Sequence, residues 1–485
     1  MQEVAVSEEK NDGLGEFPPQ PKVGRVEGPP APSAERFQEA LSYVIEKDRV
    51  VTEDLPKRFL EVLSAVLKHS NYRLVLDNFS RVTARCANCA TACQIYQATG
   101  APEDVPCYRS HLLLDIYQRH FTLKGAFSGH LLGKEPLTVE KILEMAESFY
   151  RCTACRRCTL ECPLGVDHGL ITHLGRYLLS EVGLVPRALV VSTRAQLEGE
   201  TRNTSAIPLP AILDSLEFLS EEIKEDKEID VEYPIDKEGR DFIFFAPVSD
   251  YLMEADTLMG IALMLRVSGQ QDNWTIGSKF NDGINYGLFY SDWILERCLL
   301  EIKSETERLG AKQILIGECG HASRSVKAFM GAYGGGKDAP QMTNIMELTY
   351  RLWKEGRFKL KPDVIKDRVT YHDPCNVARS GWIVKQPREI IRSFCGDFVE
   401  MEPHGEKNLC CGGGGGTVSV DELRPYRTGV MGKKKAEQLA ATGAKYVIAP
   451  CANCKKQLRE LVEDHKLEME VVGLHDLLYK AIVID

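Results

Sequence analysis

The sequence predicts an α + α/β protein, with a helical region followed by two related α/β units. Apolar residues recur at helical spacing before and within a cysteine-rich stretch between residues 86 and 162. After residue 240, the apolar runs DFIFFAP, KQILIGE, DRVTYHDP and KYVIAP predict buried strands. The tripeptide Gly-Ala-Lys precedes two of these runs, at 310–312 and 443–445, which indicates that one α/β unit is repeated.

Composition limits the classes of function. The chain has 485 residues, enough for about three domains, and its net charge of −10 gives no electrostatic support for nucleic-acid binding. The start, MQEVAVSEEKNDG, has no basic and apolar regions typical of a secretory signal. We find no apolar run of about 18 residues, so we expect a cytoplasmic protein with no membrane-crossing segment of its own.

We expect five segments along the chain. A Pro-rich and Gly-rich extended arm occupies residues 1–35, and a helical unit occupies residues 36–195. Within that unit, RFLEVLSAVLKH and LTVEKILEMAESFY both have the apolar period of an amphipathic helix. Residues 196–240 form an acidic linker or a solvated surface helix. The two α/β units occupy residues 241–360 and 361–485.

Sixteen cysteines need an explanation, and their clustering favours metal ligands over disulfides in a chain with no export signal. The strongest motif is C-x2-C-x2-C-x3-C-P, the bacterial [4Fe–4S] pattern. Its members are Cys152, Cys155, Cys158 and Cys162, followed by Pro163. A zinc site is the alternative, but zinc needs only four ligands and rarely uses this run.

A second set of cysteines lies upstream and departs from this pattern by its longer spacers. Its members are Cys86, Cys89, Cys93 and Cys107. Each of two clusters obtains four cysteine ligands if the two sets exchange their fourth members. We therefore predict two cubane [4Fe–4S] clusters, one held by Cys86, Cys89, Cys93 and Cys162, the other by Cys152, Cys155, Cys158 and Cys107.

A third set lies in the last α/β unit, where each member follows a predicted strand. Its members are Cys375, Cys410, Cys411, Cys451 and Cys454. Open α/β sheets build their sites at the carboxyl ends of strands, so we expect these residues to meet. The glycines 412–416 allow a close approach of the backbone, and their N–H groups can donate to cluster sulfurs.

The motifs HDPC, CCGGGG and APCANC resemble the cysteine-rich CCG domain of heterodisulfide reductases. With the helical two-cluster ferredoxin unit before it, the chain from about residue 80 onward resembles the HdrD/DsrK family, which includes TmcB and HmcF. The resemblance implies two pseudo-symmetric CCG-type domains, of which 361–485 is complete. It implies that the five cysteines of the third set hold a non-cubane [4Fe–4S] cluster and perform the catalysis.

The first α/β unit departs from the CCG pattern. Val248 stands where the first cysteine is expected, and no cysteine pair lies near Asn281 and Asp282. The last motif is reduced to ECGHA, with Cys319 at the position that corresponds to Cys451. We therefore expect no cluster in residues 241–360. Cys319 is a further candidate catalytic residue that faces the cluster, and a vestigial buried cysteine is the alternative.

The ECGHA motif is similar to that of the DsrK branch, and this implies a biological setting. The chain is then an oxidoreductase subunit of a DsrMKJOP-like membrane complex, peripheral on the inner face of the cytoplasmic membrane. A membrane b-type cytochrome of the DsrM/HdrE type supplies electrons, and a DsrC-like sulfur-carrier protein supplies the disulfide or trisulfide. Four alternatives stay open: a heterodisulfide reductase acting on small thiols, a glycolate or lactate oxidase subunit, a non-catalytic electron conduit, and a zinc-bound interaction protein.

The remaining chemical groups favour structural roles. Cys298 and Cys395 lie in apolar helical stretches and are expected to be buried. His321, His372 and His404 are possible proton donors, although a structural role is favoured for each one. The lysines at 433–435 and 455–456 are expected on solvated helix faces.

Overall fold

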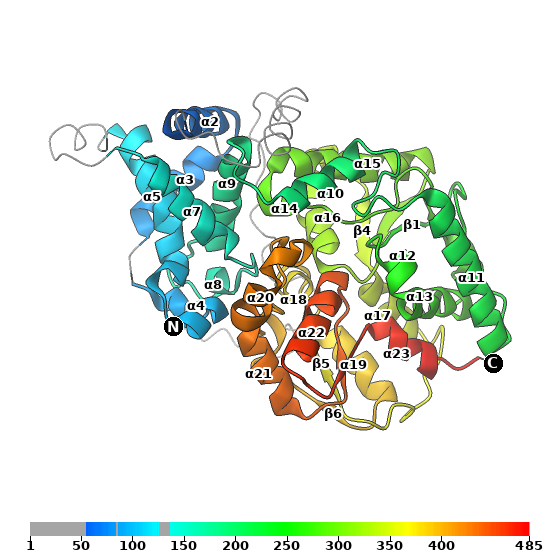
Figure 1. The fold of residues 1–485 in the computed structure, drawn as a ribbon. Coiled ribbons are helices and arrows are strands. Elements are labelled where there is room, and N and C mark those ends of the chain that lie inside the picture. The colour runs from blue at the N-terminus through cyan, green and yellow to red at the C-terminus, as the bar shows by residue number, and fades with distance from the viewer. Residues whose placement is uncertain (1–54, 84–85, 124, 126–135, 485) are drawn as a thin grey trace, which may run out of the picture.

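The computed structural model describes residues 55–83, 86–123, 125 and 136–484. The arm expected at residues 1–35 and the start of the next segment lie outside the described residues. The helical unit lies beside the two α/β units, on the left in Figure 1. In the part of the chain that the structure describes, no helix has both the length and the apolar character needed to cross a membrane.

The helical unit has one core, built from α2 (Leu55–His69), α3 (Tyr72–Val82), α5 (Pro106–Phe121), α7 (Val139–Tyr150) and α9 (His168–Glu181). The short helices α4 (Gln94–Thr99) and α8 (Arg157–Leu160) lie in its cysteine-rich part. Helix α10 (Arg187–Leu197) follows, and its buried side chains belong to a core of the first α/β unit. The predicted apolar stripes of α2 and α7 are confirmed, because Phe59, Leu63 and Met145 are fully buried. The Thr138 side chain accepts from the backbone N–H of Lys141 and so caps the start of α7.

The acidic segment at residues 196–240 contains the helix α11 (Leu209–Lys227). Its apolar face, which includes Leu216 and Ile223, is buried in the same core as strand β1 (Phe242–Phe245). Glu221 and Glu222 are exposed on the other face. The segment is therefore a surface helix packed on the first α/β unit, and not a free linker.

The first α/β unit contains a parallel four-stranded sheet in the order β2-β1-β3-β4. Its other strands are β2 (Trp274–Ile276), β3 (Gln313–Ile316) and β4 (Gln341–Asn344). Its helices are α12 (Asp250–Met253), α13 (Ala255–Val267), α14 (Gly287–Tyr290), α15 (Asp292–Arg308), α16 (Gly320–Tyr333) and α17 (Ile345–Lys354). The sheet also includes β4, which pairs with β3 and lies beyond the strands predicted for this unit.

The second α/β unit contains a parallel sheet in the order β6-β5-β7-β8. Its strands are β5 (Val369–Tyr371), β6 (Phe398–Val399), β7 (Tyr446–Ile448) and β8 (Glu470–Val472). Its helices are α18 (Cys375–Gly381), α19 (Lys385–Phe394), α20 (Arg424–Tyr426), α21 (Lys433–Thr442), α22 (Ala452–Asp464) and α23 (Leu474–Ala481). Here too the sheet includes a strand, β8, that follows the predicted strand KYVIAP and pairs with it.

One hydrophobic core joins the two α/β units. Helix α13 of the first unit packs along α23 of the second, and one buried cluster includes Leu263 and Leu477 from these helices. A Cβ atom at Gly260 would lie 2.0 Å from the backbone oxygen of His475, so the two backbones touch there. The predicted boundary at residue 360 separates two sheets, but it does not separate two cores.

Candidate functional site

The five cysteines of the third set meet at the carboxyl ends of β5 and β7. Cys375 begins α18 directly after β5, and Cys451 and Cys454 lie at the start of α22 directly after β7. Cys410 and Cys411 come from the loop that follows the 3-10 turn Gly405–Lys407. All but Cys375 are buried, and all five pack in one cluster. The sheet topology thus places these residues together, as the position of each motif predicted.

Hydrogen bonds between thiols connect these five residues in a row. Cys375 contacts Cys410, Cys410 contacts Cys411, and Cys454 contacts both Cys411 and Cys451. These contacts raise the pKa of Cys375 and Cys454 and lower the pKa of Cys411, whereas the pKa of Cys410 is lowered by Cys155 first and then by Cys375. The five cysteines thus bring several sulfur atoms together in a buried site. Sulfur is a soft ligand of the kind that binds iron–sulfur clusters.

The glycine loop after Cys411 donates to this sulfur row. The backbone N–H of Gly412 donates to Cys410 Sγ at 3.4 Å, and that of Gly413 donates to Cys411 Sγ at 3.5 Å. Gly412 has φ +102°, and a Cβ atom there would lie 2.7 Å from the backbone of Gly432. Any other residue would therefore be strained in this loop. Donor N–H groups around sulfur fit a bound iron–sulfur cluster.

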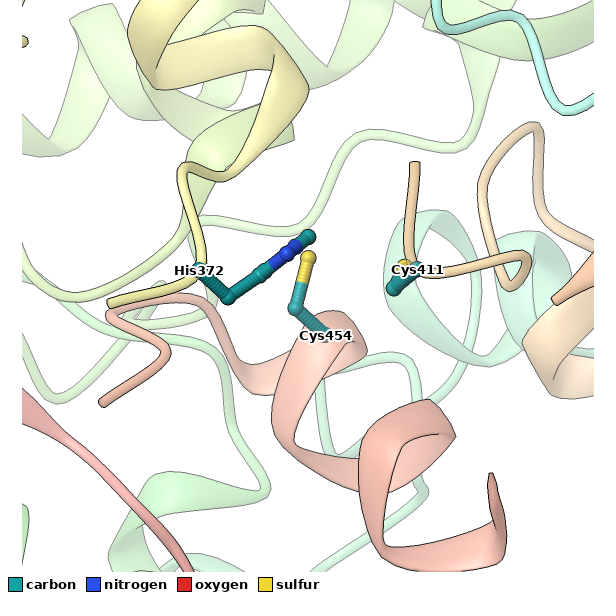
Figure 2. Close-up of side chains that lie close together, drawn as sticks. All are labelled: His372, Cys411 and Cys454. Carbon is teal, nitrogen blue, oxygen red and sulfur yellow. The ribbon is translucent and has the colours of Figure 1, made fainter. Parts of the chain in front are cut away.

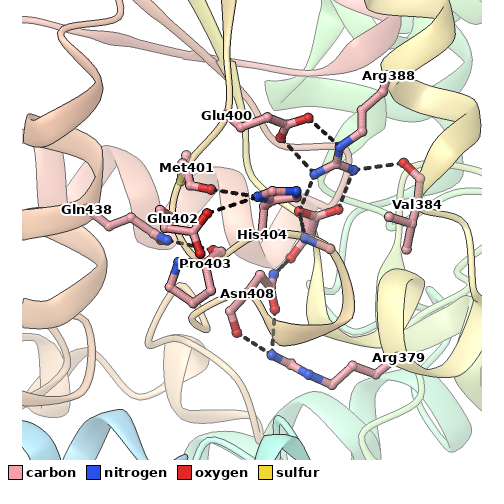
Figure 3. A network of polar contacts seen from close by, with 12 residues as sticks. Arg379, Val384, Arg388, Glu400, Met401, Glu402, Pro403, His404, Asn408 and Gln438 are labelled. Atoms are coloured by element: carbon pink, nitrogen blue, oxygen red, sulfur yellow. Dashed lines mark hydrogen bonds and ion pairs between the residues drawn. The ribbon is translucent and has the colours of Figure 1, made fainter.

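A polar network holds the HDPC loop in place (Figure 3). Arg388 binds both carboxylate oxygens of Asp373 at 2.8 Å, and Asp373 also accepts from the backbone N–H of Gly405. Asn408 links the Asp373 carbonyl to the guanidinium of Arg379. The position of Cys375 is thus fixed by charge-assisted hydrogen bonds on either side of the loop.

His372 lies deep in the same site. It is fully buried, and its ring lies near Cys411 and Cys454 (Figure 2). Neither ring nitrogen has a hydrogen-bond partner among the described residues. Burial, with the nearby Lys435, holds the pKa of His372 well below its usual range. By contrast His404 is part-exposed, and its Nδ1 lies 3.1 Å from the Met401 carbonyl.

The first two sets of cysteines lie together in the helical unit. Ala87, Ala154 and Arg156, which lie between cysteines of these motifs, all have positive φ. Non-glycine residues in this conformation are strained, and such strain concentrates at functional sites. The backbone N–H of Ala154 donates to Cys152 Sγ at 3.3 Å. Turns of this kind allow the backbone to curve around a cluster and to direct its N–H groups toward the sulfur atoms.

Side-chain contacts join members of the first two cysteine sets. The thiols of Cys89 and Cys107 hydrogen-bond, which lowers the pKa of Cys107 to about 6. Cys93 instead feels the charges of Cys152 and Cys155. Cys107 therefore lies beside Cys89, with Cys158 packed against both, because the loop before Pro106 returns Cys107 to the first turn.

The second cysteine set of the helical unit touches the site in the last α/β unit. The Cys155 thiol hydrogen-bonds to Cys410, and it packs against the same buried cluster. Arg379 donates to the Cys155 carbonyl at 3.0 Å, and buried Gln94 donates to the Cys410 carbonyl at 3.1 Å. Arg176, also buried, donates to the Cys152 and Gly415 carbonyls. Sequence patterns gave no signal for these three residues, because their partners lie far away along the chain.

The first α/β unit has a carboxylate where the second has cysteines. Asp282 is fully buried and accepts from the backbone N–H groups of Thr204, Val248 and Ile284. Burial raises its pKa. The cysteines of this unit are Cys298 and Cys319, and both are buried. Hydrogen bonds to one carboxylate thus organise these loops.

Cys319 lies beside the sulfur row, as its corresponding position predicted. It is fully buried before α16, and the next backbone N–H, of Gly320, donates to Cys451 Sγ at 3.4 Å. His321 Nδ1 lies 3.6 Å from Cys319 Sγ and 3.2 Å from the Asn453 amide nitrogen. Burial raises the pKa of Cys319 and lowers that of His321 to about 4. A neutral thiol and a neutral imidazole therefore face each other.

Two expectations for the remaining residues have different outcomes. Cys298 and Cys395 are buried, as predicted. The expectation of solvated lysine faces was wrong for Lys435 and Lys455, which are fully buried. Lys455 pairs with Glu254 at 3.0 Å, and Lys435 donates to Met401 Sδ at 3.4 Å. A run of lysines at successive helix positions points in several directions, so at least one faces inward.

Comparison with known proteins agrees with this architecture. A cysteine-rich domain family, CCG, matches residues 369–459, and a 4Fe-4S dicluster domain family matches residues 84–166. The Hdr-like menaquinol oxidoreductase iron-sulfur subunit 2 of Archaeoglobus fulgidus is 30% identical over 479 residues, which cover 90% of this chain and 85% of the relative. The corresponding iron-sulfur subunit of Archaeoglobus profundus is 28% identical, covering 91% and 86%.

A heterodisulfide reductase protein is also similar. The HdrD polypeptide of the dihydromethanophenazine:CoB–CoM heterodisulfide reductase of Methanosarcina barkeri is 23% identical, covering 82% of this chain and 93% of the relative. No solved structure matches the chain. Fold, site and matched domains define an iron–sulfur protein that joins a dicluster unit to a CCG domain. The chain belongs to the HdrD-like family of Hdr-like oxidoreductase iron–sulfur subunits.

Proposed function

We propose that this chain passes electrons through two cubane [4Fe–4S] clusters to a non-cubane [4Fe–4S] cluster, where a disulfide or trisulfide is reduced. The observation that carries the proposal is the contact between the thiols of Cys155 and Cys410. It joins a ligand of the dicluster unit directly to a ligand of the CCG site. Electron transfer slows steeply with distance, so touching ligands favour transfer between the two sites.

The side-chain contacts support one assignment of ligands. The first cubane is held by Cys86, Cys89, Cys107 and Cys162, and the second by Cys93, Cys152, Cys155 and Cys158. The Asn88 amide donates to the Glu161 carbonyl at 3.3 Å, which brings the neighbouring Cys162 toward the first turn. The non-cubane cluster is held by Cys375, Cys410, Cys411, Cys451 and Cys454. When bound, these clusters supply the electrons one at a time.

Residues around the terminal site serve the cleavage of a sulfur–sulfur bond. Reduction of a disulfide consumes two electrons and two protons and leaves two thiols. The N–H groups of Gly412 and Gly413 stabilise negative charge on sulfur. Cys319, beside Cys451, lies on the substrate side, and His321 is placed to exchange a proton with its thiol.

The family supports a setting in a membrane-associated respiratory complex. The two Archaeoglobus relatives are named as iron–sulfur subunits of menaquinol oxidoreductases. In this setting a membrane b-type cytochrome of the DsrM/HdrE type oxidises quinol and hands electrons to the first cubane. The chain then lies on the inner face of the cytoplasmic membrane in a DsrMKJOP-like complex. A DsrC-type sulfur-carrier protein is the substrate, which the ECGHA form of the first unit supports.

The two α/β units are related by pseudo-symmetry in this proposal. Both sheets have their strands in the same spatial order, with the second strand at one edge. Cys319 and Cys451 each precede the helix that follows the third strand of their sheet. Reciprocal contacts join these two positions, because Gly320 donates to Cys451 Sγ and Ala452 donates to the Glu318 carbonyl.

Replacing one ligand of the terminal cluster tests the proposal. In Cys411→Ala, we expect iron to fall from about twelve to about eight atoms per chain, with loss of disulfide reduction and retention of the cubane signals. The measurement is low-temperature EPR of anaerobic protein with iron and sulfide counts. Cys395→Ala is the control, since Cys395 is buried away from the sulfur row and should leave all three clusters intact.

Two results would contradict parts of this proposal. Unchanged turnover in Cys411→Ala means that the CCG cysteines are not the site of the reaction. About eight irons in the unaltered protein, with reduced-cubane signals only, mean that these cysteines hold no cluster. The chain would then be a plain electron conduit.

A further inference from the structure

The main chain of His372 is held firmly at the end of β5. Its N–H donates to the Ile448 carbonyl at 2.8 Å, which continues the pairing of β5 with β7. The next residue, Asp373, is bound by Arg388 through both carboxylate oxygens. The ring therefore projects from a rigid support, and its direction is set by the strand and the loop that it joins.

That direction leads into the sulfur row. A ring nitrogen of His372, Cys411 Sγ and Cys454 Sγ all lie within 4.8 Å of one another. Figure 2 shows the ring reaching from the strand end toward Cys454, with Cys411 beyond it. Whether neutral or protonated, an imidazole carries at least one N–H. A buried N–H almost always has an acceptor, because leaving it unpaired is costly.

The polar groups around His372 do not supply that acceptor. Neither ring nitrogen has a hydrogen-bond partner within the described parts of the chain. Lys435, whose charge is felt by the ring, has only donors, and its ammonium already bonds to Met401 Sδ and Gln438. The Asp373 carboxylate is occupied by Arg388 and Gly405. The sulfur atoms of Cys411 and Cys454, which lie within 4.8 Å of a ring nitrogen, can accept its N–H.

We propose that His372 donates its ring N–H to a sulfur of the CCG cluster and thereby raises the reduction potential of that cluster. Hydrogen bonds to sulfur are one of the factors that set cluster potentials. The N–H stabilises the reduced form more, because reduction adds negative charge to the sulfurs. The inference rests on the proposed function only in requiring a cluster on the third cysteine set.

The experiment compares His372→Leu, which removes the donor, with His372→Gln, which keeps an N–H. An EPR redox titration of the anaerobic full chain gives the midpoint potential of the terminal cluster. We expect a fall of about 59 mV in His372→Leu, a tenfold shift for a one-electron step, with most of it recovered in His372→Gln. His465→Leu is the control, because the His465 ring bonds to the Thr428 carbonyl at 3.0 Å and not to a cysteine. In this variant the midpoint potential of the terminal cluster should not change.

If His372→Leu loses the cluster, pulsed EPR of the unaltered chain labelled with 15N-histidine tests for the hydrogen bond instead. A weak nitrogen coupling to the terminal cluster supports the hydrogen bond. No coupling overturns it, and so does a strong coupling, which would make the ring an iron ligand. An unchanged potential in His372→Leu with all irons present also overturns it. If the unaltered chain lacks the terminal cluster, the iron count shows that the proposed function has failed as well.

Discussion

Two buried cations lie against the cysteines of the CCG site. Arg379 bonds to the Cys155 carbonyl and to Asn408, and its charge favours the thiolate forms of Cys155 and Cys375. Burial lowers the pKa of Lys435 to about 8, while Asp373 and the thiolates of the sulfur row favour its charged form. Positive charge at fixed positions in a site of low polarity stabilises a negatively charged group strongly. These side chains therefore offset the charge that several thiolates bring together.

Replacing Lys435 tests this electrostatic role. Lys435→Met removes the charge and keeps a side chain of similar length. We expect the midpoint potential of the terminal cluster to fall by about 59 mV or more, which is a tenfold change in the equilibrium constant for a one-electron step. The reason is that the reduced, more negative form loses a nearby cation. An EPR redox titration measures the change.

The neighbouring Lys434→Met is the matched control for Lys435→Met. Lys434 is part-exposed and pairs with Glu437, so the potential should stay the same. An equal fall in both variants would mean that the overall charge of the helix, and not the buried ammonium, matters.

At this scale the sequence predicted that the cysteines come together, but not the side chains that support them. The cysteines have a local signal, because the spacing of thiolates around a cluster is short and characteristic. Gln94, Arg176 and Arg379 act on carbonyls that lie far away in sequence, so no local spacing marks them. The partition of the first two sets between clusters is hard to predict for the same reason, since Cys107 reaches Cys89 only through the fold.

At the scale of elements, amphipathic helices and central strands were predictable, and edge strands were not. β1, β3, β5 and β7 are buried apolar runs in the middle of their sheets. β4 reads QMTN and β6 is two residues long, so neither has an apolar run to detect. Their pairing depends on neighbouring strands, which supply the hydrogen bonds that local sequence does not encode.

The crossing of α13 and α23 gives a prediction about stability. In Gly260→Ala, the new Cβ would lie 2.0 Å from the His475 carbonyl oxygen, so the two helices must move apart. We expect a loss of about 1–3 kcal/mol of stability and a lower melting temperature. Calorimetry or circular dichroism measures the shift.

Gly429→Ala serves as the control for this crossing. An added Cβ at Gly429 meets no atom within 4 Å, and its φ is not in the left-handed region. The melting temperature should not fall. An unchanged melting temperature in Gly260→Ala would contradict the prediction, because it would show that α13 and α23 can move apart without loss of stability.

For the whole molecule, the contact between the helical unit and the last α/β unit is polar and buried. Arg379 and Gln94 bond across it to backbone carbonyls near the cysteines. Arg151 adds a bond to the Tyr426 hydroxyl at 2.9 Å. Hydrogen bonds to fixed carbonyls define distance and orientation more sharply than apolar packing does. The separation of the clusters is thus set by this interface.

Loosening the interface should slow transfer between the clusters. Arg379→Met leaves the Cys155 and Asn408 carbonyls without their donor, at a cost of about 1–3 kcal/mol. We expect slower reduction of the terminal cluster after the cubanes are reduced, with iron content unchanged. Freeze-quench EPR after rapid mixing with a reductant follows the two steps separately.

An exposed ion pair across the same interface provides the comparison for Arg379→Met. Lys407 lies 3.9 Å from Glu161 and is 60% exposed, so it contributes little. Lys407→Met should transfer electrons at the normal rate. Equal slowing in both variants would mean that general charge, and not the buried contacts, sets the rate.

The shared core explains why a unit with no cysteine cluster is still part of the molecule. Ending the chain at residue 360 would uncover the apolar face of α13, and starting it there would uncover α23. Either fragment would expose a large apolar surface and tend to aggregate. The first unit therefore cannot be removed, because the second α/β unit folds against it.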